Sequence, residues 1–214
     1  MQLYSFFNSS TSYRVRIALA LKGLDADYHG INIRTGEHRA PDYVALNPSA
    51  VVPTLVDGEL TLGQSMAIID YLDRTYPQAR LIPEEPIARA RVLELSNLIA
   101  CDIHPVNNLR MLKYLQASLG VSAEQKDAWY RHWVREGFEA VERLLAAHGS
   151  AHGTWCFGDT PTLADVCLVP QIANALRAGC DLQPYRRSMA IYEHANQHPA
   201  FIAAQPQQQP DHSA

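Results

Sequence analysis

Hydrophobic and polar positions change their spacing near residue 82. Before it, alternating runs predict strands at residues 3–7, 27–33, 54–56 and 60–62, and helical runs predict helices at residues 13–22, 41–46 and 65–76. After it, apolar residues recur only at helical spacing, over residues 87–119, 123–147, 162–178 and 189–198. The pattern predicts an α/β domain over residues 1–81, followed by an all-helical domain over residues 86–214.

Turn residues predict where several elements end. Gly23 stops the first helix, and Asp57-Gly58 suits a type I′ hairpin turn. Pro53 cannot donate to a strand ladder, so the strand that it opens is expected at a sheet edge. Residues 205–214, rich in glutamine and proline, are expected to be frayed. The order β-α-β-α-β-β-α in the first domain is that of a thioredoxin-like arrangement.

Composition excludes several classes of function. The 214 residues carry a net charge of −4, with histidine neutral, and lack the basic surplus that nucleic-acid binding needs. No apolar run is long enough to span a bilayer, so a membrane partner is not expected either. The four cysteines are widely spaced, which favours reduced thiols and a cytoplasmic location. His194 and His198 are one helical turn apart, but no third ligand accompanies them, so no metal site is predicted.

Hydroxyl side chains crowd the start of the first helix, at Ser9, Ser10, Thr11 and Ser12. Two interpretations stay open. Ser10 or Ser12 could simply cap the helix, which is the commoner role of serine there. Alternatively, the hydroxyls and the unpaired amides of the helix end stabilise a bound thiolate or carboxylate, because a helix N-terminus favours anions.

Two further features accompany the hydroxyl cluster. A cis bond between Val52 and Pro53 would turn the N–H and C=O of Val52 outward, free to pair with a peptide. Ser65 heads the next helix, where its hydroxyl and the following amides form either a second anion site or a plain cap. The three features fall at three joints of one small α/β fold, where a peptide could lie.

These residues resemble the glutathione transferases, in which a thioredoxin-like domain precedes a helical-bundle domain, and the resemblance covers nearly the whole chain. Val52-Pro53 is similar to the family's turn that pairs with the cysteinyl backbone of glutathione. Gln64-Ser65 is similar to its clamp for the γ-glutamyl carboxylate, and His38 lies where a ligand of the glycyl end is expected. The resemblance therefore implies glutathione as cofactor.

A second motif of the family concerns stability rather than binding. Thr162 and Asp165 resemble its capping box ahead of the core helix, in which each side chain accepts from the other residue's backbone amide. Such a cap contributes about 1 kcal/mol.

Within the family, residues 9–16 resemble the zeta class, and the match strengthens at residues 101–110 and 171–177. That class usually carries cysteine after the two serines, where this chain has Thr11. The resemblance implies a cis–trans isomerase that converts maleylpyruvate to fumarylpyruvate, or maleylacetoacetate to fumarylacetoacetate, in aromatic-compound catabolism. The thiolate of glutathione would add reversibly to the double bond.

The resemblance also implies catalytic residues. Ser9, Ser10 and Thr11 are expected to stabilise the thiolate, because a hydrogen bond to the anion lowers a thiol pKa. Arg110 and Arg177 are expected to hold the carboxylates of a small dicarboxylate substrate. Arg110 has polar neighbours, which suit a surface role nearly as well.

Three residues of the helical domain are expected at the glutathione site. His104 and Asn108 lie one helical turn apart and could share a face with the ligand, although His104 could instead relieve a helix kink before Pro105. Family membership implies a homodimer, in which Asp102 reaches toward the partner's glutathione.

Two other functions compete with the isomerase. A transferase that conjugates glutathione to electrophiles, or dehalogenates small α-halo acids, could use the same site. A non-catalytic interaction module could use the same fold, but it would have no need of the ligand-site motifs.

Overall fold

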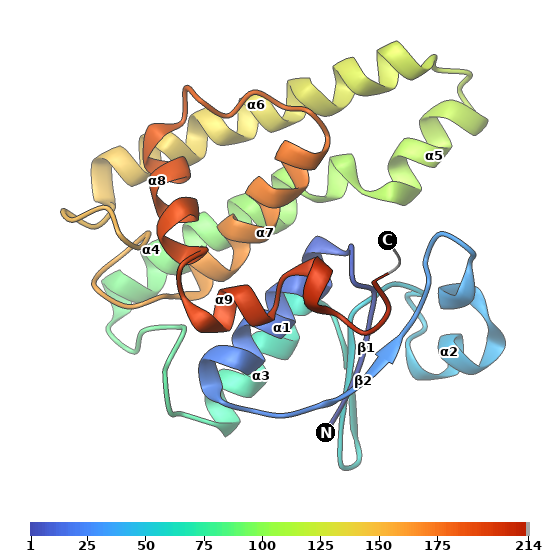
Figure 1. The fold of residues 1–214 in the computed structure, drawn as a ribbon, viewed down its shortest axis with the longest axis horizontal. Coiled ribbons are helices and arrows are strands. Elements are labelled where there is room, and N and C mark those ends of the chain that lie inside the picture. The colour runs from blue at the N-terminus through green and yellow to red at the C-terminus, as the bar shows by residue number, and fades with distance from the viewer. Residues whose placement is uncertain (213–214) are drawn as a thin grey trace. The chain divides into compact units, whose positions relative to one another are not determined.

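The computed structural model describes residues 1–212 and divides the chain into two compact units (Figure 1). The first comprises Met1–Ile82 together with the residues from Asn196 onward, and the second is Pro83–Ala195. The expected order of a thioredoxin-like unit and a helical unit is confirmed. The C-terminal residues differ from the predicted boundary, because they pack with the first unit instead of the second.

The sheet of the first unit has four strands in the order β2-β1-β3-β4. The strands are β1 (Gln2–Ser5), β2 (Asp27–Gly30), β3 (Thr54–Asp57) and β4 (Leu60–Gly63). Strand β1 is parallel to β2 and antiparallel to β3, and β3 and β4 form a hairpin. Pro53 lies just before β3, an interior strand, so the expectation of an edge strand is wrong: the proline stands outside the ladder and removes no bond from it.

Helices cover both faces of this sheet. Successive side chains of β1 alternate between the faces, so Ser5 points toward α1 (Ser10–Lys22), where its Oγ accepts from Arg16 at 3.2 Å. Tyr4 points to the other face, where its ring contacts Tyr43 of α2 (Pro41–Leu46). Helix α3 (Ser65–Thr75) packs beside α1, as Figure 1 shows.

The hairpin turn differs from the predicted type. Asp57 pairs with Leu60, so Gly58 and Glu59 are the two turn residues. Only Gly58 has a positive φ, +58°, which is the pattern of a type II′ turn. Gly23, with φ +63°, ends α1 as predicted.

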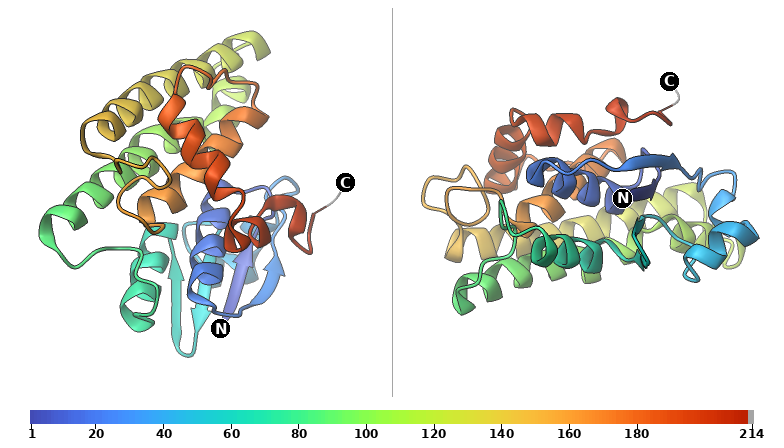
Figure 2. Two further views of the ribbon diagram at one scale, coloured as in Figure 1. Left: turned by 60° about the vertical axis from the view of Figure 1, so that its left-hand side comes forward. Right: turned by 90° about the horizontal axis from the view of Figure 1, so that it is seen from below.

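The C-terminal segment is held by specific contacts, and the expectation that it frays is wrong for its described part. It contains α9 (Pro199–Ala203), which packs on α1, and η4 (Pro206–Gln208). The Asp211 carboxylate accepts from the Phe7 N–H at 3.0 Å and from the Tyr28 hydroxyl at 2.6 Å. Figure 2 shows this segment beside the N-terminal elements. Residues 213–214 lie outside the described residues.

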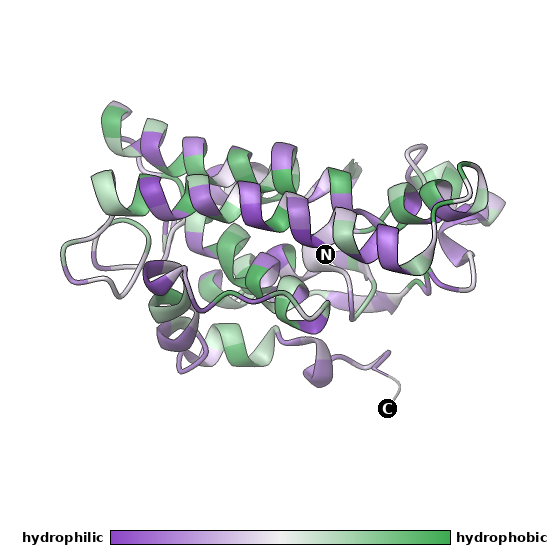
Figure 3. Ribbon diagram, turned by 90° about the horizontal axis from the view of Figure 1, so that it is seen from above, coloured by the Kyte–Doolittle hydropathy of each residue, from purple (hydrophilic) through white to green (hydrophobic). Residues whose placement is uncertain are grey.

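The second unit is helical. Its helices are α4 (Pro86–Asn97), α5 (Leu109–Ala117), α6 (Ala123–His148), α7 (Leu163–Arg177) and α8 (Arg186–Ala195). Helix α7 is buried over most of its length and packs against α4 and α8. In Figure 3 hydrophobic and hydrophilic turns alternate along the helices, as expected for helices with one buried face. No helix in the described part of the chain has the length and hydropathy to cross a bilayer.

The single helix predicted over residues 87–119 is wrong. After α4 the chain forms a π-helical turn, η2 (Leu98–Ile103), and a 3₁₀ turn, η3 (Pro105–Asn107), before α5 begins. Pro105 lacks the N–H that an α-helix needs, which accounts for the break. Gly137 of α6 lets η2 approach closely, since a Cβ there would stand 2.3 Å from Cγ1 of Ile103.

Candidate functional site

Two hydroxyls of the cluster, those of Ser9 and Thr11, form a continuous chain of hydrogen bonds at the start of α1. Ser9 is the N-cap, and its Oγ accepts from the Ser12 N–H at 3.2 Å. The Oγ atoms of Ser9 and Thr11 are 2.9 Å apart, and Thr11 donates to the carbonyl of Val52 at 3.0 Å. The capping interpretation is therefore correct for the cluster, but the cap is Ser9 instead of Ser10 or Ser12. The main-chain N–H of Thr11 has no acceptor within residues 1–212.

The loop before β3 presents the backbone groups of Val52. The Val52–Pro53 bond is cis, as expected. The Val52 carbonyl accepts from Thr11, which uses one of its two lone pairs, while its N–H has no acceptor among the described residues. Tyr43 and Asn47 both donate to the Val51 carbonyl, at 2.7 and 2.8 Å, and fix the loop from its other side.

The start of α3 is a second open helix end. Gln64, the N-cap, has a φ of +66° and makes no side-chain cap, an unusual backbone conformation for a residue other than glycine. Ser65 is buried, and the N–H groups of Ser65 and Ala67 have no acceptor in the part of the chain that is described. Helix dipole and free amides together favour an anion at this end.

Arg14 is the site residue that the sequence did not reveal. Its side chain is 1% exposed, and Nη1 donates to Ser65 Oγ at 3.4 Å. Its Nε and Nη2 have no partner among residues 1–212. Arginine on a surface helix normally reaches water, so spacing alone gave no sign of a buried cation behind Ser65.

The open groups of the first unit fit a peptide with a terminal carboxylate. The Val52 N–H can pair with a peptide backbone, and the open end of α3, with the Arg14 charge behind it, favours a carboxylate. The free amide of α1 favours an anion such as a thiolate. These are the groups that glutathione requires. His38, half-buried, lies in η1 (Glu37–Arg39) of the same unit.

The candidates at the start of α5 are grouped together. Asn108 caps this helix, its Oδ1 accepting from the Arg110 N–H at 3.1 Å, and its Nδ2 lies 3.5 Å from His104 Nε2. The Arg110 side chain is exposed, and its guanidinium has no partner within the described chain. Asp102, exposed in η2, likewise has no partner there. Both charges are available to a ligand or a partner.

Arg177 ends α7 and is exposed. Its Nη2 donates to the Oδ1 of Asn174, which orients the guanidinium. Burial raises the pKa of the Tyr130 phenol to about 12, against the opposing charge of Arg177. The Tyr130 hydroxyl has no hydrogen-bond partner among residues 1–212.

Comparison with known proteins decides the family. Residues 1–74 match the model of the glutathione S-transferase N-terminal domain, and residues 124–196 that of its C-terminal domain. The chain belongs to the glutathione transferase family. The predicted transferase fold, with its thioredoxin-like unit first, is confirmed.

Relatives and solved structures of this family place the chain close to the zeta class. A probable maleylacetoacetate isomerase of Vibrio cholerae is 46% identical, over 98% of this chain and 97% of that protein. The holo structure of a maleylpyruvate isomerase, a bacterial zeta-class glutathione transferase, is 43% identical with a TM-score of 0.96 over the whole of both chains. A maleylacetoacetate isomerase of Methylobacterium extorquens AM1 with bound malonate and glutathione is 34% identical, with a TM-score of 0.94 over both whole chains. The predicted resemblance to the zeta class is confirmed.

Proposed function

We propose that this transferase is a glutathione-dependent cis–trans isomerase that acts on maleylpyruvate or maleylacetoacetate in the breakdown of aromatic compounds. One observation carries the proposal. Full-length relatives that are named isomerases of these two substrates share a fold whose first unit here offers the open groups that glutathione needs. A relative that holds glutathione together with malonate, a small dicarboxylate, supports the same combination of ligands.

The first unit is proposed to bind glutathione. The N–H of Val52, next to Pro53, pairs with the tripeptide backbone, while Gln64 and Ser65 receive the γ-glutamyl carboxylate at the open end of α3. His38 is assigned to the glycyl end. When bound, glutathione supplies the thiol whose anion is the nucleophile of the isomerisation.

The start of α1 is proposed to favour that anion. Ser10, 8% exposed, stands in the first turn of the helix, beside the free N–H of Thr11. A hydroxyl donor and a helix-end amide both stabilise a thiolate, and so lower its pKa from the ordinary value of about 8.5.

The second unit is proposed to hold the substrate. Arg110 and Arg177 each bind a carboxylate, and their fixed charge stabilises the negative charge that develops during the reaction. Both guanidinium groups are exposed, and that of Arg177 is oriented by Asn174. His104 and Asn108, which lie against each other, are proposed to support the same ligand side of α5.

The test is a spectrophotometric assay of both substrates with and without glutathione. We expect turnover only with glutathione, and a loss of about 10- to 100-fold in Arg110→Ala and Arg177→Ala, the worth of one charge-assisted hydrogen bond. Both variants should still bind glutathione in calorimetry. Arg135→Ala, which removes another exposed arginine of the second unit, is the matched control and should keep full activity.

Three outcomes would contradict the proposal. Full turnover without glutathione would remove the cofactor from the mechanism. Unchanged rates in both arginine variants would remove these residues from the substrate site. Release of a glutathione conjugate with no isomerised product would point to the conjugating transferase instead.

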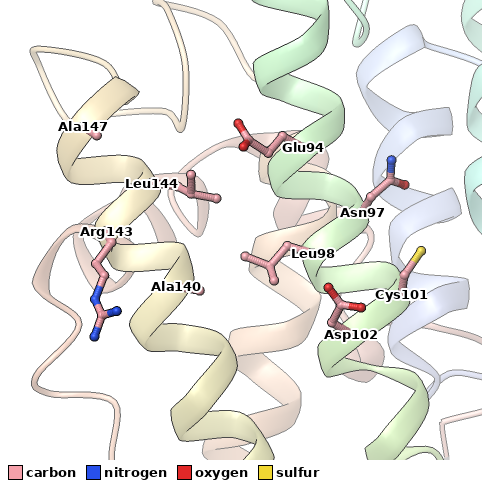
Figure 4. A pocket seen from close by; sticks show the side chains of 9 residues that line it. All are labelled: Glu94, Asn97, Leu98, Cys101, Asp102, Ala140, Arg143, Leu144 and Ala147. Atoms are coloured by element: carbon pink, nitrogen blue, oxygen red, sulfur yellow. The ribbon is translucent and has the colours of Figure 1, made fainter.

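We also propose that the chain forms a homodimer through a groove of about 690 Å³ between α4–η2 and α6 (Figure 4). Leu98 and Leu144 point toward each other across this groove. Its α4–η2 side carries Glu94 and Asp102, and its α6 side carries Arg143, so two copies related by a twofold axis bring opposite charges together. In this arrangement Asp102 is proposed to reach the partner's glutathione.

Sedimentation velocity tests the dimer. We expect the wild type to sediment at twice the monomer mass and Leu98→Glu to sediment as a monomer with an unchanged circular dichroism spectrum. A wild-type monomer at micromolar concentration would refute the proposal.

None of the four cysteines, all within the described residues, forms a disulfide. Reduced cysteines support the further proposal of a cytoplasmic location, which cell fractionation would check.

A further inference from the structure

Two of the hydroxyl protons at the start of α1, those of Ser9 and Thr11, can be assigned to acceptors inside the protein. A carbonyl oxygen can only accept, so the single hydroxyl proton of Thr11 is donated to Val52 over 3.0 Å. Thr11 then has no proton left for Ser9, 2.9 Å away, so Ser9 is the donor in that pair. Ser9 Oγ in turn accepts from the Ser12 N–H. The direction of the whole chain is therefore fixed, from the helix amide to the Val52 carbonyl.

The direction of these hydrogen bonds indicates that Thr11 holds the Val52 peptide group. The hydroxyl protons of Ser9 and Thr11 are both committed inside the protein, and the chain ends on the residue whose N–H stands open. On the other side of the loop, Tyr43 and Asn47 fix the Val51 carbonyl. Thr11 is thus the contact through which the start of α1 sets the position of the Val52 peptide group.

We propose that Thr11 is a positioning residue of the glutathione site: its hydroxyl fixes the Val52 peptide group that pairs with the tripeptide, and it gives no proton to the sulfur. The inference rests on the proposed function, since it takes glutathione as the ligand of this unit. It predicts a specific division of effects. Losing the Thr11 hydroxyl weakens glutathione binding and leaves the ionisation of the bound thiol unchanged.

The decisive variant is Thr11→Val, which keeps the shape of the side chain and removes the hydroxyl. We expect its KM for glutathione to rise about threefold to tenfold, the worth of one neutral hydrogen bond, with kcat nearly unchanged. The pKa of the bound thiol, followed by the ultraviolet absorbance of the thiolate, should equal that of the wild type. Thr11→Ser keeps the hydroxyl and should restore the wild-type KM, which a purely steric role of threonine would not.

Ser10→Ala provides the contrasting signature, because Ser10 is the residue proposed to act on the sulfur. It should raise the pKa of the bound thiol and lower kcat. A raised thiol pKa in Thr11→Val would overturn the inference, and so would an unchanged KM. If Thr11→Val does not fold, Thr11→Ala and Thr11→Ser are compared by the same two measurements. A wild type that takes up no glutathione in calorimetry would refute the proposed function itself, before any variant is compared.

Discussion

Two capping boxes within residues 1–212 allow one motif to be tested in two environments. Thr162 and Asp165 cap α7, and Ser122 and Gln125 cap α6. The predicted box at α7 is confirmed. Its carboxylate is fully buried and also accepts from the Cys156 N–H at 2.7 Å, in addition to the Thr162 N–H at 2.8 Å. In the exposed box at α6, the side chain of Gln125 accepts from the Ser122 N–H at 2.9 Å.

The perturbation is Asp165→Ala, with Gln125→Ala as its match. Asp165→Ala leaves two buried N–H groups without an acceptor, at about 1–3 kcal/mol each. Burial raises the pKa of Asp165, so removing its charge relieves part of this cost, and we expect a net loss of about 3 kcal/mol. In Gln125→Ala the released N–H meets water, and we expect a loss of about 0.5 kcal/mol. A larger loss in Asp165→Ala than in Gln125→Ala would show that a capping box contributes most to stability where the N–H groups that it pairs are buried.

The assay is urea unfolding followed by tryptophan fluorescence. Trp129, Trp133 and Trp155 all lie in the second unit, so the signal reports the unit that carries both caps. A loss of about 3 kcal/mol corresponds to a fall of about 6–12 °C in Tm for a chain of this size. Losses in the two variants that agree within about 0.5 kcal/mol would refute the reasoning, since burial would then make no difference.

Three further variants test other features of the two units. Burial raises the pKa of the Tyr130 phenol to about 12, so the folded state favours the neutral phenol. The free energy of unfolding of the wild type should therefore fall as pH rises from about 10 to 12. In urea unfolding, Tyr130→Phe should lose less stability than the wild type between pH 9 and pH 11, by about 1 kcal/mol. Gly137→Ala should lower the free energy of unfolding by about 1–2 kcal/mol, because overpacking against Ile103 costs more than the gain in helix propensity. In a double-mutant cycle, the same substitution in an Ile103→Ala background should cause no such loss. Arg14→Met should leave the Tm unchanged or raised, since a buried cation without an anion is costly, yet weaken glutathione binding in calorimetry about tenfold; equal binding would remove Arg14 from the site.

The elements that the sequence predicted well are those with local signals at both ends. Helix α2 matches its predicted range because Pro41 suits a first helical turn and Pro48 disfavours helix at Asn47. Gly23 ends α1 for an equally local reason. The failures depend on distant contacts. Nothing near Asp211 in the sequence shows that its carboxylate binds Phe7, 204 residues earlier, so a polar tail was expected to fray.

The candidate site divides in the same way. Ser65 and the hydroxyl cluster were identifiable because the chemistry of a helix N-terminus is local. The bond from Thr11 to Val52 joins the first turn of α1 to a loop 41 residues later, and the burial of Arg14 depends on how α1 packs, so neither could be predicted from spacing. The sequence thus predicted where the groups that could bind a ligand lie, while the structure showed which of their hydrogen-bond donors are already paired within the protein.

Helix N-termini serve two opposite purposes in this chain, and the partners of their amides tell the purposes apart. At α7, the Thr162 side chain accepts from the Ala164 N–H at 3.3 Å and the Asp165 carboxylate accepts from the Thr162 N–H, so these amides are paired within the protein itself. At α1 and α3, amides of Thr11 and Ser65 have no acceptor within residues 1–212. A serine at a helix start is therefore weak evidence for a binding site, because it suits a cap equally well. An amide that the fold leaves open is stronger evidence, because a polar group left unpaired by the protein must find water or a ligand. The two open ends belong to the unit in which glutathione is proposed to bind, so the proposal rests more on these backbone groups than on the identity of any hydroxyl, and the presence of threonine at position 11 does not weaken it.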